Sequence, residues 1–214
     1  MSLPAETPYD VLSRFGLGRL SGSGFPGESS GLLSHFSNWR PVSQATLAYG
    51  YGLSVTPLQL AQAYAAIGSG GLQHPISLLR LDQTPIARRI IKAETASAVL
   101  SMLEAVVGVD GTGRRAAVAG YRIAGKTGTA WKYVPGGYAE DRYIASFSGI
   151  APATRPRLAV VVVIDDPTGG DYYGGELAAP VFSRVVEGAL RILAIPPDNF
   201  VRPSGTTKLA ARRP

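Results

Sequence analysis

The sequence has no cysteine and only two histidines, His35 and His74, which lie far apart in the chain. Without cysteine, disulfides and thiolate metal sites are excluded. Each histidine is better explained as a surface or loop residue than as a ligand, so we expect neither a metal nor a cofactor. The longest purely apolar run, residues 158–164, has the length of a strand. It is far shorter than the roughly 20 residues of a membrane span.

Negative charge is also scarce, and the formal net charge is +6. About half of this excess lies in residues 196–214, where Arg202, Lys208, Arg212 and Arg213 outweigh Asp198. This segment has no apolar period, so we expect a disordered basic tail and no nucleic-acid partner. With 214 residues, 45% of them hydrophobic, the chain is long and apolar enough to form one sizeable core.

Helix signals are clearest around Thr56. This residue is followed by proline and, three positions on, by Gln59, which predicts a capped helix over residues 57–67. A short helix is expected near residues 9–15, where Gly16 stops it, and longer helices over 93–107 and 176–193. The last of these offers six apolar side chains to cover a sheet: Val181, Phe182, Val185, Val186, Leu190 and Leu193.

Three segments of strand character separate the last two long helices, at residues 123–134, 143–150 and 157–165. Pro135 and Pro152 lie in the short connections between them, which favours an antiparallel meander. The predicted fold class is therefore α+β, an antiparallel sheet with covering helices.

Residues 120–127, GYRIAGKT, match the phosphate-loop pattern G-x-x-x-x-G-K-[ST]. Downstream, an apolar run ends in Asp165 and Asp166, which resembles the magnesium-binding strand of nucleotide hydrolases. A phosphate loop, however, needs a helix to begin at its lysine and threonine. After Lys126 the chain is β-branched and aromatic until Pro135. We therefore disfavour a nucleotide hydrolase and expect no nucleotide partner.

A lysine on a strand can instead belong to an anion site. Thr127 and Thr129 alternate around Gly128, so both hydroxyls point to one face, and the glycine lets a ligand approach the backbone. The simpler alternative is that Lys126 is only a solvated residue at a sheet edge. These residues alone do not decide between the two.

Lys126-Thr-Gly-Thr129 resembles the K-[ST]-G-T motif of serine penicillin-recognising enzymes. The resemblance extends to FGLG at residues 15–18, GFPGE at 24–28, and the blocks at 45–66, 147–167 and 172–182. Together these cover nearly all of residues 8–195 in the family's order. The sequence is thus similar to the penicillin-binding transpeptidases, and most of all to septal class B enzymes of Gram-negative bacteria.

The resemblance implies roles for nine residues. Lys126 keeps the pocket electropositive, Thr127 and Thr129 hold a terminal carboxylate beside Gly128, and the Thr129 N–H stabilises an oxyanion. The pocket walls are expected to be tyrosines: Tyr49, Tyr51, Tyr143, Tyr172 and Tyr173. The implied ligands are peptidoglycan stem peptides and β-lactams, with divisome membrane proteins as partners.

One departure from the family pattern concerns the nucleophile. No S-x-x-K is present, because the residues three before the lysines are Arg89, Ile123, Thr129 and Gly205, and no S-x-N occurs. We therefore interpret residues 1–195 as the C-terminal portion of a transpeptidase domain, inactive alone. The serine and a membrane anchor at the periplasmic face of the inner membrane would lie outside this chain. Such a portion is expected to self-associate.

Three alternatives stay open. A D,D-carboxypeptidase or serine β-lactamase shares the lysine–threonine chemistry, although the blocks around Tyr49 and Tyr172 resemble division enzymes. A noncatalytic binding module is the second alternative, and the disfavoured phosphate-loop enzyme is the third.

Overall fold

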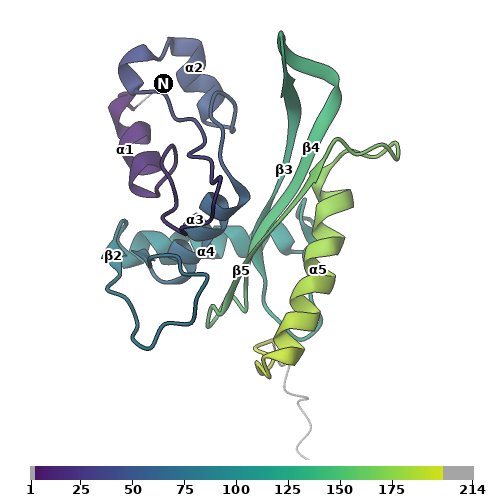
Figure 1. Ribbon diagram of the computed structural model, residues 1–214. Coiled ribbons are helices and arrows are strands. Elements are labelled where there is room, and N and C mark those ends of the chain that lie inside the picture. Colours follow the sequence, from purple (N-terminus) through teal and green to yellow (C-terminus); the bar gives the residue numbers. More distant parts are fainter. Residues whose placement is uncertain (1–2, 200–214) are drawn as a thin grey trace, which may run out of the picture.

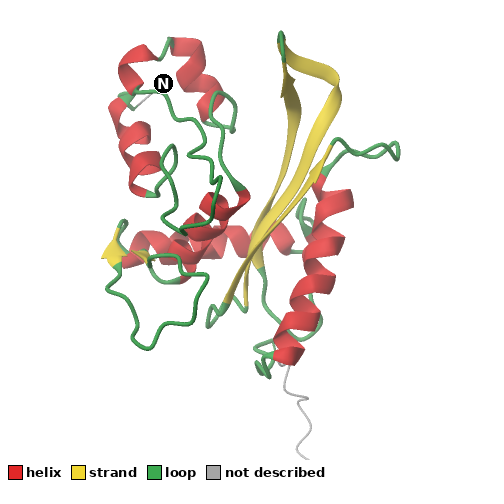
Figure 2. Ribbon diagram, viewed as in Figure 1, coloured by secondary structure: helices red, strands yellow, loops and turns green. Residues whose placement is uncertain are grey.

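A three-stranded antiparallel sheet lies between one long helix and two others (Figures 1 and 2). The computed structural model describes residues 3–199. The strands are β3 (Ala124–Val134), β4 (Gly137–Ala151) and β5 (Leu158–Asp165), in the order β3-β4-β5. The predicted fold class and the antiparallel meander are confirmed.

The hairpin between β3 and β4 is tighter than predicted. Val134 pairs with Gly137, so residues 137–142, expected to be a connection, belong to the strand. Gly136 has φ +105° and follows Pro135. Proline and then a glycine with positive φ suit the two central positions of a tight turn, so the chain reverses within two residues. The long hairpin extends past the first residues of α5 (Gly174–Ile192) (Figure 1).

Helix α5 (Gly174–Ile192) covers one face of the sheet. Its fully buried side chains include Phe182, Val186 and Leu190. Three residues predicted to face the sheet, Val181, Val185 and Leu193, are instead 41%, 50% and 52% exposed. That part of the prediction is wrong because successive helix residues turn by about 100°. Only side chains spaced three or four residues apart along α5 point to the sheet.

Helices α3 (Pro57–Gly68) and α4 (Ala93–Val107) pack on the opposite face. The Thr56 hydroxyl accepts from the Gln59 N–H, and the Gln59 side chain accepts from the Thr56 N–H, so the predicted capping box is confirmed. Tyr64 from α3 and Leu103 from α4 pack against a buried cluster in and beside the sheet. That cluster consists of Ala124, Ile150 and Ala153.

The N-terminal region wraps around the start of α3. It contains α1 (Glu6–Arg14), η1 (Phe36–Asn38) and α2 (Pro41–Leu47), and farther along come β1 (Leu72–Gln73), β2 (Arg88–Arg89) and η2 (Arg114–Ala116). Gln59, 1% exposed, holds the wrap to the helix. Its amide donates to the carbonyl oxygens of Arg19 at 2.6 Å and Ser30 at 2.8 Å. No helix within residues 3–199 is long and apolar enough to cross a bilayer.

The chain after α5 returns to the sheet. The Asp198 carboxylate accepts from the backbone N–H groups of Arg122 at 2.8 Å and Thr154 at 3.3 Å, and from the Thr154 hydroxyl. The tail boundary predicted at residue 196 is therefore too early, because residues 196–199 are held in place. The rest of the predicted tail, residues 200–214, lies outside the described residues.

Burial of Tyr64 makes the stability of the fold sensitive to alkaline pH. Burial raises the pKa of Tyr64 from 10.0 to about 12, so the folded state favours the neutral phenol. This stabilisation is complete below pH 10 and is lost as the pH rises towards 12.

Between pH 10 and pH 12, native protein should lose roughly 2 kcal/mol of unfolding free energy through ionisation of Tyr64, and Tyr64→Phe should not show this loss. Urea unfolding across this pH range measures the difference. Tyr133→Phe, at a 70% exposed site, is the control and should leave the loss unchanged. Equal pH profiles for native protein and Tyr64→Phe would contradict the assignment.

Candidate functional site

Lys126, Thr127, Gly128 and Thr129 lie consecutively on β3, where they pair with Ser148, Phe147, Ser146 and Ala145 of β4. The other edge of β3 has no strand beside it among residues 3–199. The residues after Lys126 continue as a strand through Val134. A phosphate loop requires a helix there, so the structure excludes that interpretation.

The Lys126 ammonium lies over the backbone of its own strand. Its Nζ donates to the Thr127 carbonyl oxygen at 3.0 Å and approaches the Thr127 hydroxyl at 3.4 Å. The Thr127 hydroxyl is also 3.2 Å from that of Thr112. The lysine is exposed and forms no ion pair with an acid in the described part of the chain. Its charge is therefore available to an anion.

Thr129 connects β3 to the start of α5. Its hydroxyl oxygen accepts a hydrogen bond from the Gly174 N–H at 3.0 Å. A side chain at Gly174 would place its Cβ 2.3 Å from the Ser146 carbonyl oxygen and 2.4 Å from that of Gly128. Thr127 also lies beside α5, against Gly175. Both threonines thus face α5, which confirms that they share one face of the strand.

One group of predicted wall residues gathers beside Thr129. The rings of Tyr143 and Tyr172 stack with centroids 4.0 Å apart, and the Tyr172 hydroxyl donates to that of Tyr173 at 3.1 Å. This hydrogen bond raises the pKa of Tyr172. Because Tyr173 directly precedes Gly174, the contact between Gly174 and Thr129 places this group next to the strand.

The other predicted wall residues, Tyr49 and Tyr51, lie after α2 and meet the far part of the hairpin. Together with Trp131 and Tyr138 they line a cavity of about 330 Å³. The Tyr51 hydroxyl accepts from the Trp131 backbone N–H at 3.0 Å. Sequence reasoning missed Trp131, Tyr138 and Thr112. Trp131 follows Thr129 by two positions, and that alternation was the available signal.

Two acidic residues that imitated a magnesium site form ion pairs instead. Asp165 accepts from Lys132 at 2.8 Å, and Asp166 pairs with Arg142. The hydrogen bond from Arg142 lowers the pKa of Asp166. Across residues 3–199, no group of three His, Cys, Asp or Glu side chains could hold a metal ion.

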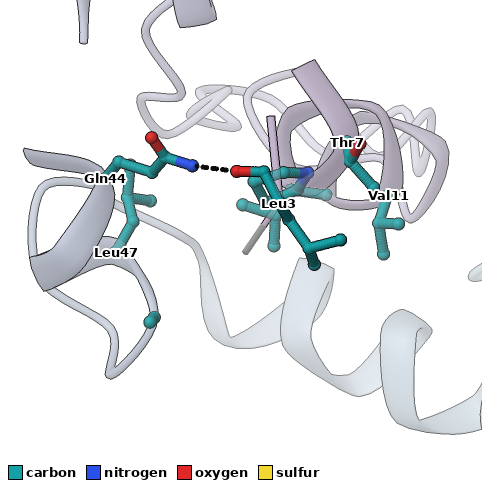
Figure 3. A pocket seen from close by; sticks show the side chains of 8 residues that line it. Leu3, Thr7, Val11, Gln44 and Leu47 are labelled. Atoms are coloured by element: carbon teal, nitrogen blue, oxygen red, sulfur yellow. Dashed lines mark hydrogen bonds between the residues drawn. The ribbon is translucent and has the colours of Figure 1, made fainter. Parts of the chain in front are cut away.

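An apolar pocket of about 530 Å³ lies between α1 and α2 (Figure 3). Val11 and Leu47 line it from the two helices, and the Gln44 amide donates to the Leu3 carbonyl oxygen at 2.9 Å. None of its lining side chains is titratable. Its one hydroxyl, on Thr7, has no acid or base beside it in the lining, so the edge of β3 remains the candidate site.

Comparison with known proteins gives the family. Residues 1–187 match the penicillin binding protein transpeptidase domain. The peptidoglycan D,D-transpeptidase FtsI of Escherichia coli K12 is 46% identical over 198 residues, which are 92% of this chain and 34% of that protein. The probable peptidoglycan D,D-transpeptidase PenA of Neisseria meningitidis is 45% identical over 195 residues, 91% of this chain and 34% of the relative.

Solved structures of similar proteins support the same family. The apo TP domain of penicillin-binding protein 3 from Burkholderia pseudomallei superposes with a TM-score of 0.86 at 44% identity, covering 92% of this chain and 60% of that one. A peptidoglycan glycosyltransferase from Burkholderia ambifaria gives a TM-score of 0.82 at 38% identity, with 92% and 59% covered. The chain spans about a third of the length of its curated relatives. It belongs to the penicillin-binding protein transpeptidase domain family.

Proposed function

We propose that this chain provides the carboxylate- and oxyanion-binding part of a peptidoglycan D,D-transpeptidase, with septal cell-wall synthesis as its setting. The observation that carries the proposal is the exposed Lys126 ammonium beside the Thr127 hydroxyl on an unpaired strand edge, free of acidic partners among residues 3–199. Such an edge can bind an extended peptide through its backbone, and the ammonium can bind the terminal carboxylate of that peptide.

The hydroxyls are suited to donate to that carboxylate. The Thr129 oxygen already accepts the Gly174 N–H, so its own hydrogen is free for a ligand. The Thr127 oxygen lies within reach of the Lys126 ammonium and 3.2 Å from the Thr112 hydroxyl. When it accepts from both groups, its hydrogen too is available to a ligand. Two O–H donors and one ammonium then surround one carboxylate. This complementarity supports the assignment of these three side chains to ligand binding.

The reaction would be acyl transfer through a serine outside this chain. The serine oxygen attacks the carbonyl carbon between the two terminal D-alanines, and the bond to the last D-alanine breaks, releasing it as an amine. An amine of a neighbouring stem peptide then attacks the acyl-enzyme and restores the serine. β-Lactams would acylate the same serine. The backbone N–H of Thr129 would stabilise the oxyanion in both steps.

The setting of this reaction belongs to the proposal too. An anchor outside this chain would hold the enzyme at the periplasmic face of the inner membrane, where divisome membrane proteins are its partners. The names of the FtsI and PenA relatives support the transpeptidase activity.

Lys126→Ala tests the proposal in a longer protein that carries the serine. Acylation by a fluorescent penicillin should slow about tenfold, because the substitution removes a charge-assisted hydrogen bond to the carboxylate. Lys132→Ala is the matched control on the same strand, since Lys132 is paired with Asp165, and it should acylate at the native rate. Equal rates for Lys126→Ala and native protein would contradict the role of Lys126.

The chain alone should show no covalent label on a denaturing gel, since its proposed nucleophile lies elsewhere. A covalently labelled band with one label per chain would show that this chain carries its own nucleophile and would refute the proposal. Magnesium-dependent ATP binding that Lys126→Ala abolishes would favour a phosphate over a carboxylate.

A further inference from the structure

We infer that Tyr51 ends the ligand-binding edge of β3 and so limits how many residues of an extended peptide can pair with it. The inference rests on the proposed function, because it concerns the same edge and the same ligand. Tyr51 thereby becomes a specificity-determining residue in addition to a wall of the pocket.

The first step concerns which backbone groups the edge presents. In a strand, every second residue directs its N–H and C=O to the same side. The Thr127 carbonyl accepts from Lys126 and the Trp131 N–H donates to Tyr51, so both residues face the unpaired edge. Thr129, midway between them, faces the same way. A peptide added to this edge meets Thr127, then Thr129, then Trp131.

The second step is that the last of these positions is already filled. The Tyr51 hydroxyl lies 3.0 Å from the Trp131 nitrogen, where the carbonyl of an added strand would otherwise accept. The Tyr51 ring is held edge-on by Tyr138 at 5.1 Å and Tyr49 at 5.9 Å between centroids. Its backbone N–H donates to the Thr46 carbonyl. These contacts fix the phenol across the edge.

The third step gives the length of the open segment. Thr129 and Trp131 are two residues apart, about 6.8 Å along a strand. A ligand whose carboxylate lies at Lys126 and Thr127 can therefore pair beside Thr129. It must then leave the edge before Trp131, next to the cavity of about 330 Å³ lined by Tyr49, Trp131 and Tyr138. The site thus selects a short extended end whose continuation turns away from the strand.

Hydrogen exchange tests the blocking contact directly. In the native full chain, the Trp131 amide should exchange slowly, and Tyr51→Phe should speed its exchange about tenfold, because the phenylalanine ring cannot accept the N–H. Tyr133→Phe is the control from the same hairpin, with a 70% exposed side chain, and should leave Trp131 unchanged. An unchanged Trp131 amide in Tyr51→Phe would overturn the inference.

Peptide length tests the consequence. N-acetylated peptides of two to five residues ending in D-Ala-D-Ala are titrated into the labelled chain, and the amide shifts of Thr127 and Thr129 are followed by NMR. In native protein and in Tyr133→Phe, each added peptide residue should raise the affinity only until the peptide is long enough to reach Trp131. The peptide residue that would lie beside Trp131 should add nothing. In Tyr51→Ala, which removes the ring from the edge as well as the hydroxyl, that residue should tighten binding about 2- to 10-fold, as one added hydrogen bond does.

The outcomes separate this inference from the proposed function. If the short peptides shift Thr127 and Thr129 but native protein and Tyr51→Ala share one length dependence, the role of Tyr51 is overturned and the proposed ligand stands. If no peptide shifts these amides in any of the three proteins, the proposed ligand is contradicted, and the inference falls with it.

Discussion

Replacing Gly174 with alanine should destabilise the chain by about 3 kcal/mol or more, because it inserts a methyl group between two backbones. The added Cβ would lie 2.3 Å and 2.4 Å from the carbonyl oxygens of Ser146 and Gly128. Neither oxygen can withdraw without breaking the pairing of β3 with β4. The helix must move instead, which lengthens the bond from the Gly174 N–H to Thr129. Urea unfolding measures the loss.

Gly188→Ala is the matched control in the same helix. No atom of residues 3–199 lies within 4 Å of a Cβ built there, and alanine is the better helix former by roughly 0.5–1 kcal/mol. This variant should therefore be slightly more stable than the native chain. If both variants changed stability in the same direction by similar amounts, the close approach of α5 to the sheet would be refuted.

Gln59→Leu should cost about 3 kcal/mol. The leucine keeps much of the side-chain volume but removes both amide donors, so the carbonyl oxygens of Arg19 and Ser30 lose their hydrogen bonds in a buried place. The acceptor half of the capping box is lost as well. Because this single side chain joins α3 to the N-terminal wrap, thermal or urea unfolding should also become less cooperative.

Gln62→Leu provides the comparison, one turn along the same helix. Within the described part of the chain, Gln62 makes one exposed hydrogen bond, to the His74 carbonyl at 3.2 Å. Its replacement should change the unfolding free energy by no more than about 0.5 kcal/mol. A similar loss in both variants would show that the buried hydrogen bonds of Gln59 to the wrap add no more stability than the single exposed bond of Gln62.

Local signals account for the parts of the fold that the sequence predicted well. The Thr56 and Gln59 capping box starts α3, and the apolar period of residues 93–107 matches α4 at both ends. Helix α2 was missed because its seven residues lack a side-chain cap and are too few to show a period. The start of β4 was missed because a loop and a polar, exposed strand share one composition.

In the candidate site, too, features encoded by a local motif could be predicted and contacts between distant residues could not. The motif at Lys126 gave the strand and the shared face of Thr127 and Thr129. The partners of those residues lie far away in sequence, since Gly174 is 45 residues beyond Thr129 and Tyr51 is 80 before Trp131. No local pattern encodes contacts at such separations. The catalytic and binding roles of the nine residues remain predictions for the experiments above.

The position of Trp131 makes the native chain its own optical reporter. The sequence has two tryptophans. Trp39 lies in the N-terminal wrap, where its indole N–H donates to Ser34, while Trp131 is 48% exposed at the end of the ligand edge. Light absorbed at the red edge of the spectrum excites only these two indoles. A peptide that settles along β3 changes the water around Trp131 and leaves Trp39 untouched. Quenching by iodide or acrylamide therefore follows occupancy of the edge without any attached dye.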